Sequence, residues 1–133
     1  MTTPNQDQTV TELILLNERL LQSIAGGDWK TYAELCDGSI TAFEPEARGY
    51  LVEGMGFHKF YFDLGGSTGP RHTTITSPHV RLMGDVAVVS FVRITQRLDD
   101  SGNPATYHSE ETRVWQRKDG VWRHVHFHRS ITD

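Results

Sequence analysis

Residues 105–129, with the sequence ATYHSEETRVWQRKDGVWRHVHFHR, decide the fold. In this stretch, two runs of alternating apolar and polar residues flank the dipeptide Asp119-Gly120. Asp-Gly between alternating runs is a strong signal for a β-hairpin, because both residues tolerate the positive φ angles of a tight turn. We therefore predict two antiparallel strands, over about 105–117 and 121–129.

Two more strand-like runs precede this hairpin, over about 72–83 and 86–98. Gly84-Asp85 connects them, and the hexapeptide DDSGNP at 99–104 leads into the next run. Both connections are rich in turn-forming residues. Consecutive hairpins of this kind predict an antiparallel meander.

The beginning of the chain has helical periodicity. Apolar residues recur at helical spacing between positions 10 and 24, and Gly26-Gly27 supplies a stop signal. Thr9 and Glu12 have the spacing of a capping box, which predicts a helix that starts there. The preceding polar residues, 1–8, are predicted to be a disordered N-terminus.

Two further helices and one strand complete the pattern. Asp28 can cap a short second helix over 29–36, and an apolar stripe predicts a third helix over 51–64. Between them, residues 40–43 read as a strand that ends at Glu44-Pro45, because proline cannot continue a ladder.

Helices come first and the sheet afterwards, with no repeat, linker or low-complexity tract between them. This order predicts a single α+β domain over 9–133. One face of the sheet must be buried, so a curved antiparallel sheet wrapped around the helices is expected to enclose a conical cavity.

The composition excludes several classes of protein. The 133 residues include 13 Lys and Arg against 17 Asp and Glu, a net charge of −4, so we expect no nucleic-acid or membrane partner. Cys36 is the single cysteine, so no intramolecular disulfide can form, as is usual in a reducing compartment. The start lacks a signal-peptide pattern, and no apolar run approaches the ~20 residues of a membrane span. We predict a cytoplasmic location.

Three arginines continue apolar rows of their strands: Arg93, Arg113 and Arg129. A guanidinium among apolar neighbours is costly unless it is paired or hydrated, so their convergence predicts a polar, water-accessible pocket. Glu111 falls on the same strand face as Arg113 and can neutralise one charge. Such a pocket is suited to a small anion, because the planar guanidinium meets a carboxylate with two bonds.

Other interpretations of these arginines stay open at this point. They could form a structural ion-pair network with Glu44, Glu110 or Glu111, or reach outward to a neighbouring subunit. A guanidinium-rich interior would also depress the pKa of a neighbouring carboxylate and weaken it as a base.

The histidines and the thiol are weaker candidates. His124, His126 and His128 alternate along one strand, opposite the face of Arg129, and this spacing can ligate zinc. No further ligand is evident nearby, so we predict no metal site and a face packed against another subunit instead. Cys36 is predicted to be buried core and not a nucleophile, because no partner histidine is indicated.

Eight strings carry a resemblance to a known family. In chain order they are TAFEPEA at 41–47, LVEG at 51–54, FHKFYF at 57–62, HTTI at 72–75, LMGD at 82–85, RITQ at 93–96, SEETRVW at 109–115 and VHFHRS at 125–130. Together they resemble the association (hub) domain of calcium/calmodulin-dependent protein kinase II over about residues 11–130.

The resemblance implies a nuclear transport factor 2-like fold, an α+β cone, and self-assembly into two stacked rings that hold kinase domains together. This chain has no glycine-rich phosphate loop and no His-Arg-Asp or Asp-Phe-Gly string. We therefore expect a stand-alone member without a kinase domain, not itself an enzyme, whose partners are copies of itself, a small carboxylate and a kinase in trans. The glycine-rich loop at 65–70 is shorter than in relatives, which puts a lid role for it in doubt.

The resemblance also implies site residues. Arg93, Arg113 and Arg129 match the cavity arginines of the family, and Tyr32 and His58 match pocket-lining positions. With Glu111, the predicted ligand-binding set is Arg93, Arg113, Arg129, His58, Tyr32 and Glu111, with no catalytic residue and no cofactor. The alternative is a small-molecule isomerase or lyase of the same broad fold, which would use cavity His, Tyr and Glu side chains. Subunit contacts are expected on the faces around 86–92 and 122–128.

Overall fold

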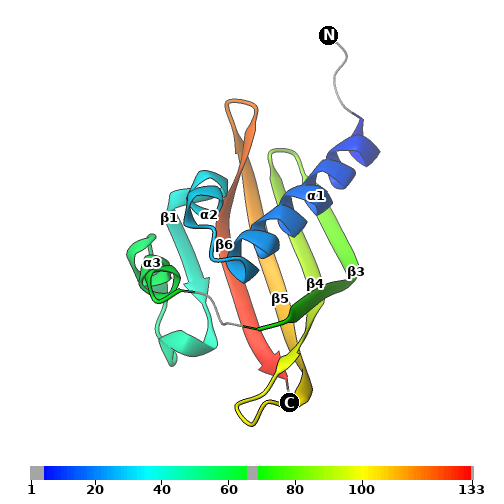
Figure 1. Ribbon diagram of the computed structural model, residues 1–133. Coiled ribbons are helices and arrows are strands. Elements are labelled where there is room, and N and C mark those ends of the chain that lie inside the picture. The colour runs from blue at the N-terminus through cyan, green and yellow to red at the C-terminus, as the bar shows by residue number, and fades with distance from the viewer. Residues whose placement is uncertain (1–4, 66–68, 133) are drawn as a thin grey trace.

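The computed structural model describes residues 5–65 and 69–132, which form one curved sheet with helices against one of its faces (Figure 1). The helices are α1 Gln6–Ala25, α2 Trp29–Leu35 and α3 Gly56–Asp63, with a 3₁₀ turn, η1, at Pro45–Ala47. The strands are β1 Cys36–Phe43, β2 Val52–Glu53, β3 Arg71–Met83, β4 Val86–Leu98, β5 Pro104–Lys118 and β6 Val121–Thr132.

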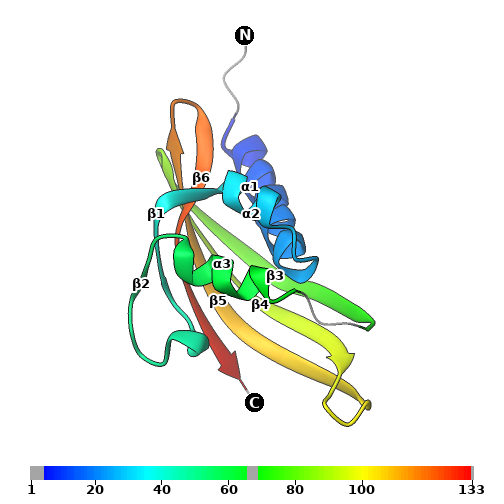
Figure 2. The same cartoon turned by 60° about the vertical axis from the view of Figure 1, so that its left-hand side comes forward.

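The sheet has the order β2-β1-β6-β5-β4-β3. Strands β3 to β6 form the predicted antiparallel meander, whereas β1 pairs with β6 in parallel. Figure 2 shows the sheet curving around the helices, and Figure 1 shows α1 crossing the face of its β3–β5 part and α3 beside β1. We call this covered face the inner face.

The β5–β6 hairpin has the predicted turn. Asp119 and Gly120 have φ angles of 52° and 78°, so both central residues adopt the left-handed conformation of a type I′ turn. Strand β4 has the predicted bounds, and β6 extends three residues beyond the prediction.

The start of α1 corrects the predicted N-terminus. The helix begins at Gln6, because Asn5 and Gln8 form the capping box: the Asn5 side chain accepts from the Gln8 backbone N–H at 2.8 Å, and the Gln8 side chain accepts from the Asn5 N–H at 2.9 Å. Thr9 is instead buried in the first turn. The prediction of disorder is therefore wrong for residues 5–8, and residues 1–4 lie outside the described part.

The predicted third helix is shorter than expected. Val52 and Glu53 pair with Ala42 and Thr41 as strand β2, and Gly54, with a φ of 81°, turns the chain toward α3. Residues 51–64 thus contain two elements: the short strand β2, which pairs with β1, and the helix α3. The second helix is confirmed, and Asp28 caps it by accepting from the Thr31 N–H at 3.2 Å.

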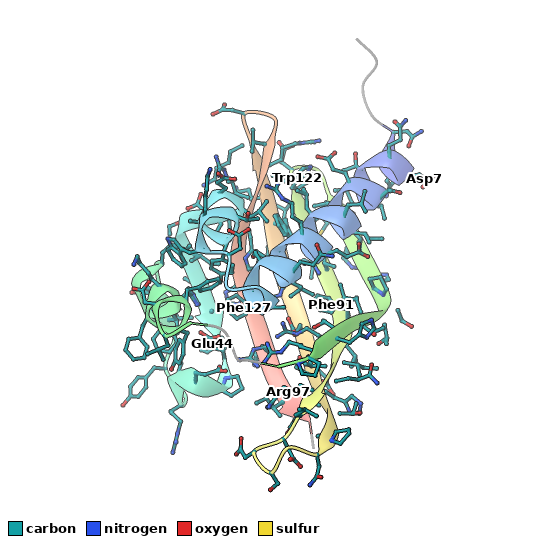
Figure 3. The ribbon with its side chains drawn as sticks, in the orientation of Figure 1. Asp7, Glu44, Phe91, Arg97, Trp122 and Phe127 are labelled. Carbon is teal, nitrogen blue, oxygen red and sulfur yellow. The ribbon has the colours of Figure 1, made fainter. Side chains whose placement is uncertain are left out.

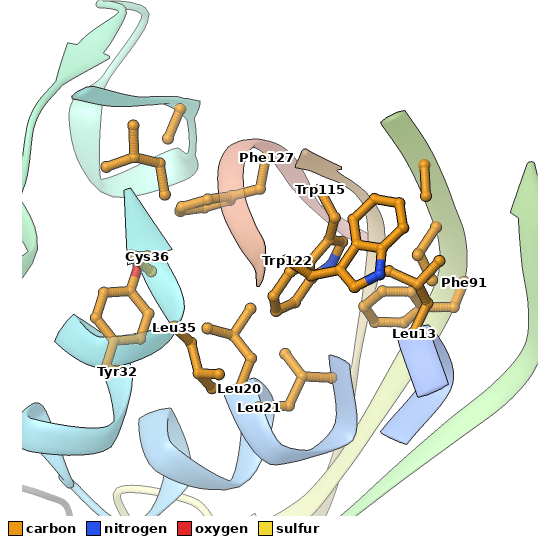
Figure 4. Packing of buried hydrophobic residues seen from close by; sticks show 14 of the residues in the cluster. Leu13, Leu20, Leu21, Tyr32, Leu35, Cys36, Phe91, Trp115, Trp122 and Phe127 are labelled. Carbon is orange, nitrogen blue, oxygen red and sulfur yellow. The ribbon is translucent and has the colours of Figure 1, made fainter. Parts of the chain in front are cut away.

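The core lies between α1, α2 and the inner face (Figure 4). Leu13, Leu20 and Leu21 of α1 pack toward Trp115, which is fully buried. The Trp115 indole N–H donates to the side-chain oxygen of Asn17 at 3.4 Å, so its one polar atom is satisfied. No helix in the described ranges is long and apolar enough to span a bilayer.

Candidate functional site

A cavity of about 410 Å³ lies over the inner face, a size typical of small-molecule sites. Five of the six predicted ligand-binding residues line it: Tyr32, His58, Arg93, Arg113 and Arg129. Glu111 does not line it, but bonds two of the lining arginines. Figure 3 shows Glu44 and Arg97, two further lining residues, on opposite sides of the inner face, with Phe127 above them. The structure thus gathers side chains from α2, α3 and three strands of the sheet.

Glu111 is the shared counter-charge of two arginines. Its Oε2 lies 2.6 Å from Arg93 Nε, and its Oε1 accepts from Arg113 Nη2 at 2.7 Å and from Arg113 Nε at 3.0 Å. Ser109 donates to Oε2 at 2.7 Å. Burial alone would raise the pKa of Glu111, but the two guanidinium groups and the Ser109 hydroxyl outweigh burial and lower this pKa below its usual value.

Arg113 retains one unsatisfied donor. Its side chain is 1% exposed, and among the described residues no acceptor bonds its Nη1. The guanidinium lies over the Phe127 ring, 4.4 Å from the centroid. A buried donor without a partner is rare in a folded protein, so the cavity presents a group that an anion can satisfy.

Arg129 has carboxylate partners at the other side of the cavity. It donates to both oxygens of Glu46, and its Nη2 lies 3.9 Å from Glu44 Oε2. The ion-pair network that we considered as an alternative therefore exists in part, through Glu111 and Glu44, and Glu46, which that alternative did not include, also belongs to it. Glu110 is not in it, because it lies on the outer face opposite Val92.

Glu44 and His58 form an unusual pair. Burial, helped by the nearby Glu46 carboxylate, raises the pKa of Glu44 to about 7 despite Arg129 and Arg113. Burial, together with Arg113, lowers the pKa of His58 to about 4. Glu44 Oε1 and His58 Nδ1 are 3.5 Å apart without hydrogen-bond geometry. The expectation that guanidinium groups depress a neighbouring carboxylate therefore holds for Glu111 and fails for Glu44, where desolvation is larger.

Stability is expected to fall with rising pH because of Glu44. Between the usual pKa of 4.5 and about 7, the folded protein holds the Glu44 proton more tightly than the unfolded chain, so the free energy of unfolding decreases as pH rises through this window. Glu44→Gln removes this penalty. We expect the variant to exceed the unmodified protein by about 2 kcal/mol above the window and to equal it below, measured by urea unfolding.

The opposite titration of His58, which weakens folding as pH falls from 6.5 to about 4, occurs in both proteins and cancels in the difference. A difference between Glu44→Gln and the unmodified protein that stays constant across the window would contradict the raised pKa.

The three histidines of β6 do not share one face. Arg113 opposes Phe127 and Trp115 opposes His124, so Val125 is the extra residue of a β-bulge. His124 therefore points inward and is fully buried, whereas His126 points outward and its Nδ1 lies 2.7 Å from Thr41 Oγ1. The predicted single row is wrong. In the described ranges, no three His, Cys, Asp or Glu side chains are grouped to hold a metal ion.

The bulge also corrects one predicted subunit contact. Trp122 is 5% exposed and packs in the core together with His124, so the face around 122–128 offers only its outward residues to a neighbour.

Cys36 has a histidine partner that the sequence did not indicate. Its Sγ lies 3.5 Å from His124 Nδ1, a contact between residues 88 positions apart. Burial raises the pKa of the thiol to about 12 and lowers the pKa of His124 well below its usual value. Both groups are therefore neutral, and Cys36 is buried core, as predicted.

Several lining residues were missed by the sequence reasoning: Arg71, Arg97, Tyr107 and His108. Alternation could have predicted that Arg97 lines the cavity, because Arg97 lies four positions after Arg93 and therefore on the same strand face. Residues 66–68 of the glycine-rich loop, whose role as a lid we doubted, lie outside the described part of the chain.

Comparison with known proteins places these features in context. The family model "Calcium/calmodulin dependent protein kinase II association domain" matches residues 9–133. The delta subunit of calcium/calmodulin-dependent protein kinase type II from Oryctolagus cuniculus is 54% identical over 122 residues, which cover 90% of this chain and 23% of that protein. The chain thus spans about a quarter of the length of this relative.

Solved structures agree. The association domain of C. elegans CaMKII has a TM-score of 0.88 at 44% identity, over 94% of this chain and 97% of that one. The CaMKII hub homology domain of Chlamydomonas reinhardtii has a TM-score of 0.85 at 47% identity, over 92% and 97%. A putative dehydratase of the NTF2-like family from Streptomyces avermitilis, at 20% identity and a TM-score of 0.78 over 97% and 99%, shares the fold. The predicted nuclear transport factor 2-like α+β fold is confirmed.

Proposed function

Because this chain belongs to the calcium/calmodulin-dependent protein kinase II association domain family, we propose that it is a self-assembling scaffold whose arginine-lined cavity captures a small carboxylate anion. Family membership supports the assembly. The Nη1 of Arg113, buried and without a partner among residues 5–65 and 69–132, carries the second part, since the edge of a guanidinium can meet a carboxylate with two parallel hydrogen bonds.

Apolar surface left over by the monomer supports self-association. Tyr50 is 77% exposed, and Phe43 and Ile131 lie beside it along one groove. Exposed apolar side chains that gather in this way mark protein interaction sites. A second copy that covers them would form a homo-oligomer, for which we propose the two stacked rings implied by the family.

Light scattering tests the assembly. We expect the unmodified protein to form a particle of many subunits, and Tyr50→Ser to shift the mass toward smaller species, because it removes a large apolar contact without touching the core. Leu15→Ser is the matched control, since Leu15 is 59% exposed on α1, away from the groove. A monomeric or dimeric unmodified protein would contradict the scaffold and favour a passive binding module.

A kinase in trans is the partner that we propose for the assembled chain, because the relative from Oryctolagus cuniculus is a kinase subunit of which this chain spans 23%. Affinity purification of the tagged chain from its source cells, followed by mass spectrometry, tests this partnership. If the chain is recovered without any kinase, the proposed partnership is wrong, and the proposed self-assembly is unaffected.

Glu44 favours a second candidate function, a small-molecule isomerase or lyase. A carboxyl group with a pKa of about 7 is matched to proton abstraction at neutral pH, and burial keeps the Tyr32 phenol protonated by raising its pKa. Turnover of a carbonyl substrate that is lost in Glu44→Gln would establish this activity. Carboxylate binding without turnover would leave anion capture as the function of the cavity.

A further inference from the structure

We propose that Glu44 is a ligand-binding residue of the cavity, which hydrogen-bonds the captured carboxylate through a protonated carboxyl group, so that the anion and one proton are bound together. This inference deepens the anion capture proposed above and rests on it. It gives Glu44, which was not in the predicted ligand-binding set, a role in binding in place of the proton abstraction that an isomerase would require.

The position of Glu44 brings its carboxyl group into the cavity. Glu44 follows strand β1 directly and precedes η1, and its side chain is 9% exposed. Oε1 is buried, and among residues 5–65 and 69–132 no hydrogen-bond partner reaches it. A buried carboxylate oxygen without a donor is unfavourable, whereas a protonated oxygen is itself a donor that requires an acceptor. A ligand carboxylate is such an acceptor.

The ring of Phe127 lies between Arg113 and the pair of His58 and Glu44. The Arg113 guanidinium carbon is 4.4 Å from the centroid of this ring, and the centroid of the His58 ring is 5.5 Å from it. Glu44 Oε1 is in turn 3.5 Å from His58 Nδ1. All four side chains line the cavity. Arg113 Nη1 and Glu44 Oε1, both without partners in the described part of the chain, can therefore donate to one carboxylate bound beside this ring.

The arginines near Glu44 are already paired with other carboxylates. Arg129 donates to both oxygens of Glu46, and its Nη2 stays 3.9 Å from Glu44 Oε2, too far for a hydrogen bond. Arg113 uses Nε and Nη2 for Glu111. Within the described ranges, neither guanidinium thus gives Glu44 a hydrogen bond, and the neutral carboxyl form is favoured.

The charge balance of the ion-paired groups favours the uptake of an anion together with a proton. Three guanidinium groups and three carboxyl groups form the ion pairs of the cavity: Arg93, Arg113, Arg129, Glu44, Glu46 and Glu111. When all six are ionised, their charges cancel. Protonation of Glu44 leaves one positive charge, which one carboxylate balances, whereas an ionised Glu44 would repel that carboxylate.

The surroundings of Glu44 bring its titration close to neutral pH. In the described part of the chain, the charged and titratable groups that face it come from five elements: Tyr32 of α2, Glu46 of η1, His58 of α3, Arg113 of β5 and Arg129 of β6. Burial above all raises the pKa of Glu44 to about 7. A bound anion raises this pKa further, because a like charge disfavours the ionised form. Above about pH 7, each captured anion is therefore accompanied by about one proton.

Calorimetric titration of the assembled protein with acetate tests this coupling. We expect the affinity for acetate to be constant below about pH 7 and to fall by about tenfold per pH unit above it, because the proton must then be taken from solvent. Tris and triethanolamine are two amine buffers with different ionisation enthalpies. At about pH 8, the binding enthalpies measured in these buffers should differ by the amount that corresponds to about one proton taken up per acetate.

Glu44→Gln imitates the protonated state, because the amide donates a hydrogen bond and carries no charge. We expect this variant to bind acetate at about pH 8 as tightly as the unmodified protein does at about pH 6, and to take up no proton. His108 also lines the cavity but is retained in the variant, so the difference between the two proteins reports Glu44 alone. Glu53→Gln is the matched control, since Glu53 is exposed on β2 outside the cavity lining, and it should keep the full pH dependence.

Three outcomes would overturn this role of Glu44 while anion capture stands. The first is an acetate affinity of the unmodified protein that does not change with pH, and the second is proton uptake that persists in Glu44→Gln. The third is a loss of acetate binding in Glu44→Gln at every pH, because an uncharged donor should suffice. If acetate binds neither protein at any pH, the proposed capture fails together with this inference.

Discussion

Replacement of Glu111 by glutamine is expected to lower the free energy of unfolding by about 3–5 kcal/mol, the usual cost of removing one partner from a buried ion pair. Glu111 is 3% exposed and bonds both Arg93 and Arg113, so its neutralisation leaves two guanidinium groups facing each other without a counter-charge. Urea unfolding at matched protein concentration measures the loss, because assembly also stabilises the fold. Glu110→Gln, on the outer face of the same strand, should change stability by less than about 0.5 kcal/mol.

The variant Glu111→Gln also distinguishes between two roles of the cavity arginines, anion capture and a purely structural ion-pair network. In Glu111→Gln the cavity gains a positive charge, so acetate should bind more tightly and restore part of the lost stability. A larger thermal shift with acetate than in the unmodified protein is the expected result. If Glu111→Gln is unstable and indifferent to acetate, the arginines serve the structure alone.

Arg113→Met is expected to abolish the thermal shift that acetate gives the unmodified protein. A ligand at 100 times its Kd adds about 2.7 kcal/mol to the free energy of unfolding, which is a shift of several degrees for a domain of this size. The variant lacks the buried Nη1 that we assign to the carboxylate, so this gain should disappear. Differential scanning fluorimetry across an acetate series measures the effect.

Arg117→Met is the matched control for that experiment. It lies on the same strand, but pairs with Asp85 at 2.8 Å outside the cavity, so the full shift should persist. Because Glu111→Gln leaves both Arg93 and Arg113 without their shared counter-charge, the double variant Glu111→Gln with Arg113→Met, which leaves only Arg93 in that state, should recover part of the stability that Glu111→Gln loses. A full response to acetate in Arg113→Met would remove Arg113 from the site.

The sequence predicted those parts of the site that depend on local alternation. Arg93, Arg113 and Arg129 were placed on the inner face because the two-residue period holds next to each of them, on β6 from Phe127 to Arg129, and Glu111 followed from its offset of two from Arg113. The same reasoning failed for His124, since a bulge at Val125 inserts one residue that no local pattern reveals.

Features that depend on distant residues could not be predicted. The contact between Cys36 and His124 requires the parallel pairing of β1 with β6, which no hairpin signal predicts. Val52 was assigned to a helix because its partner in the sheet, Ala42, lies outside its local window. At α1, the capping box is formed by Asn5 with Gln8 in place of the predicted Thr9 with Glu12.

The bulge at Val125 determines which mutations of β6 preserve the inward and outward faces of this strand. Substitution along β6 leaves the phase of the strand intact, so side chains can be exchanged one at a time. Loss of the single codon for Val125 would close the bulge and leave Trp122 and His124 pointing inward, because His126 and His124 already oppose the consecutive residues Val114 and Trp115. This strand can therefore lose one residue at the bulge without reversing its faces, whereas the loss of a further residue would turn the side chains on one side of it over.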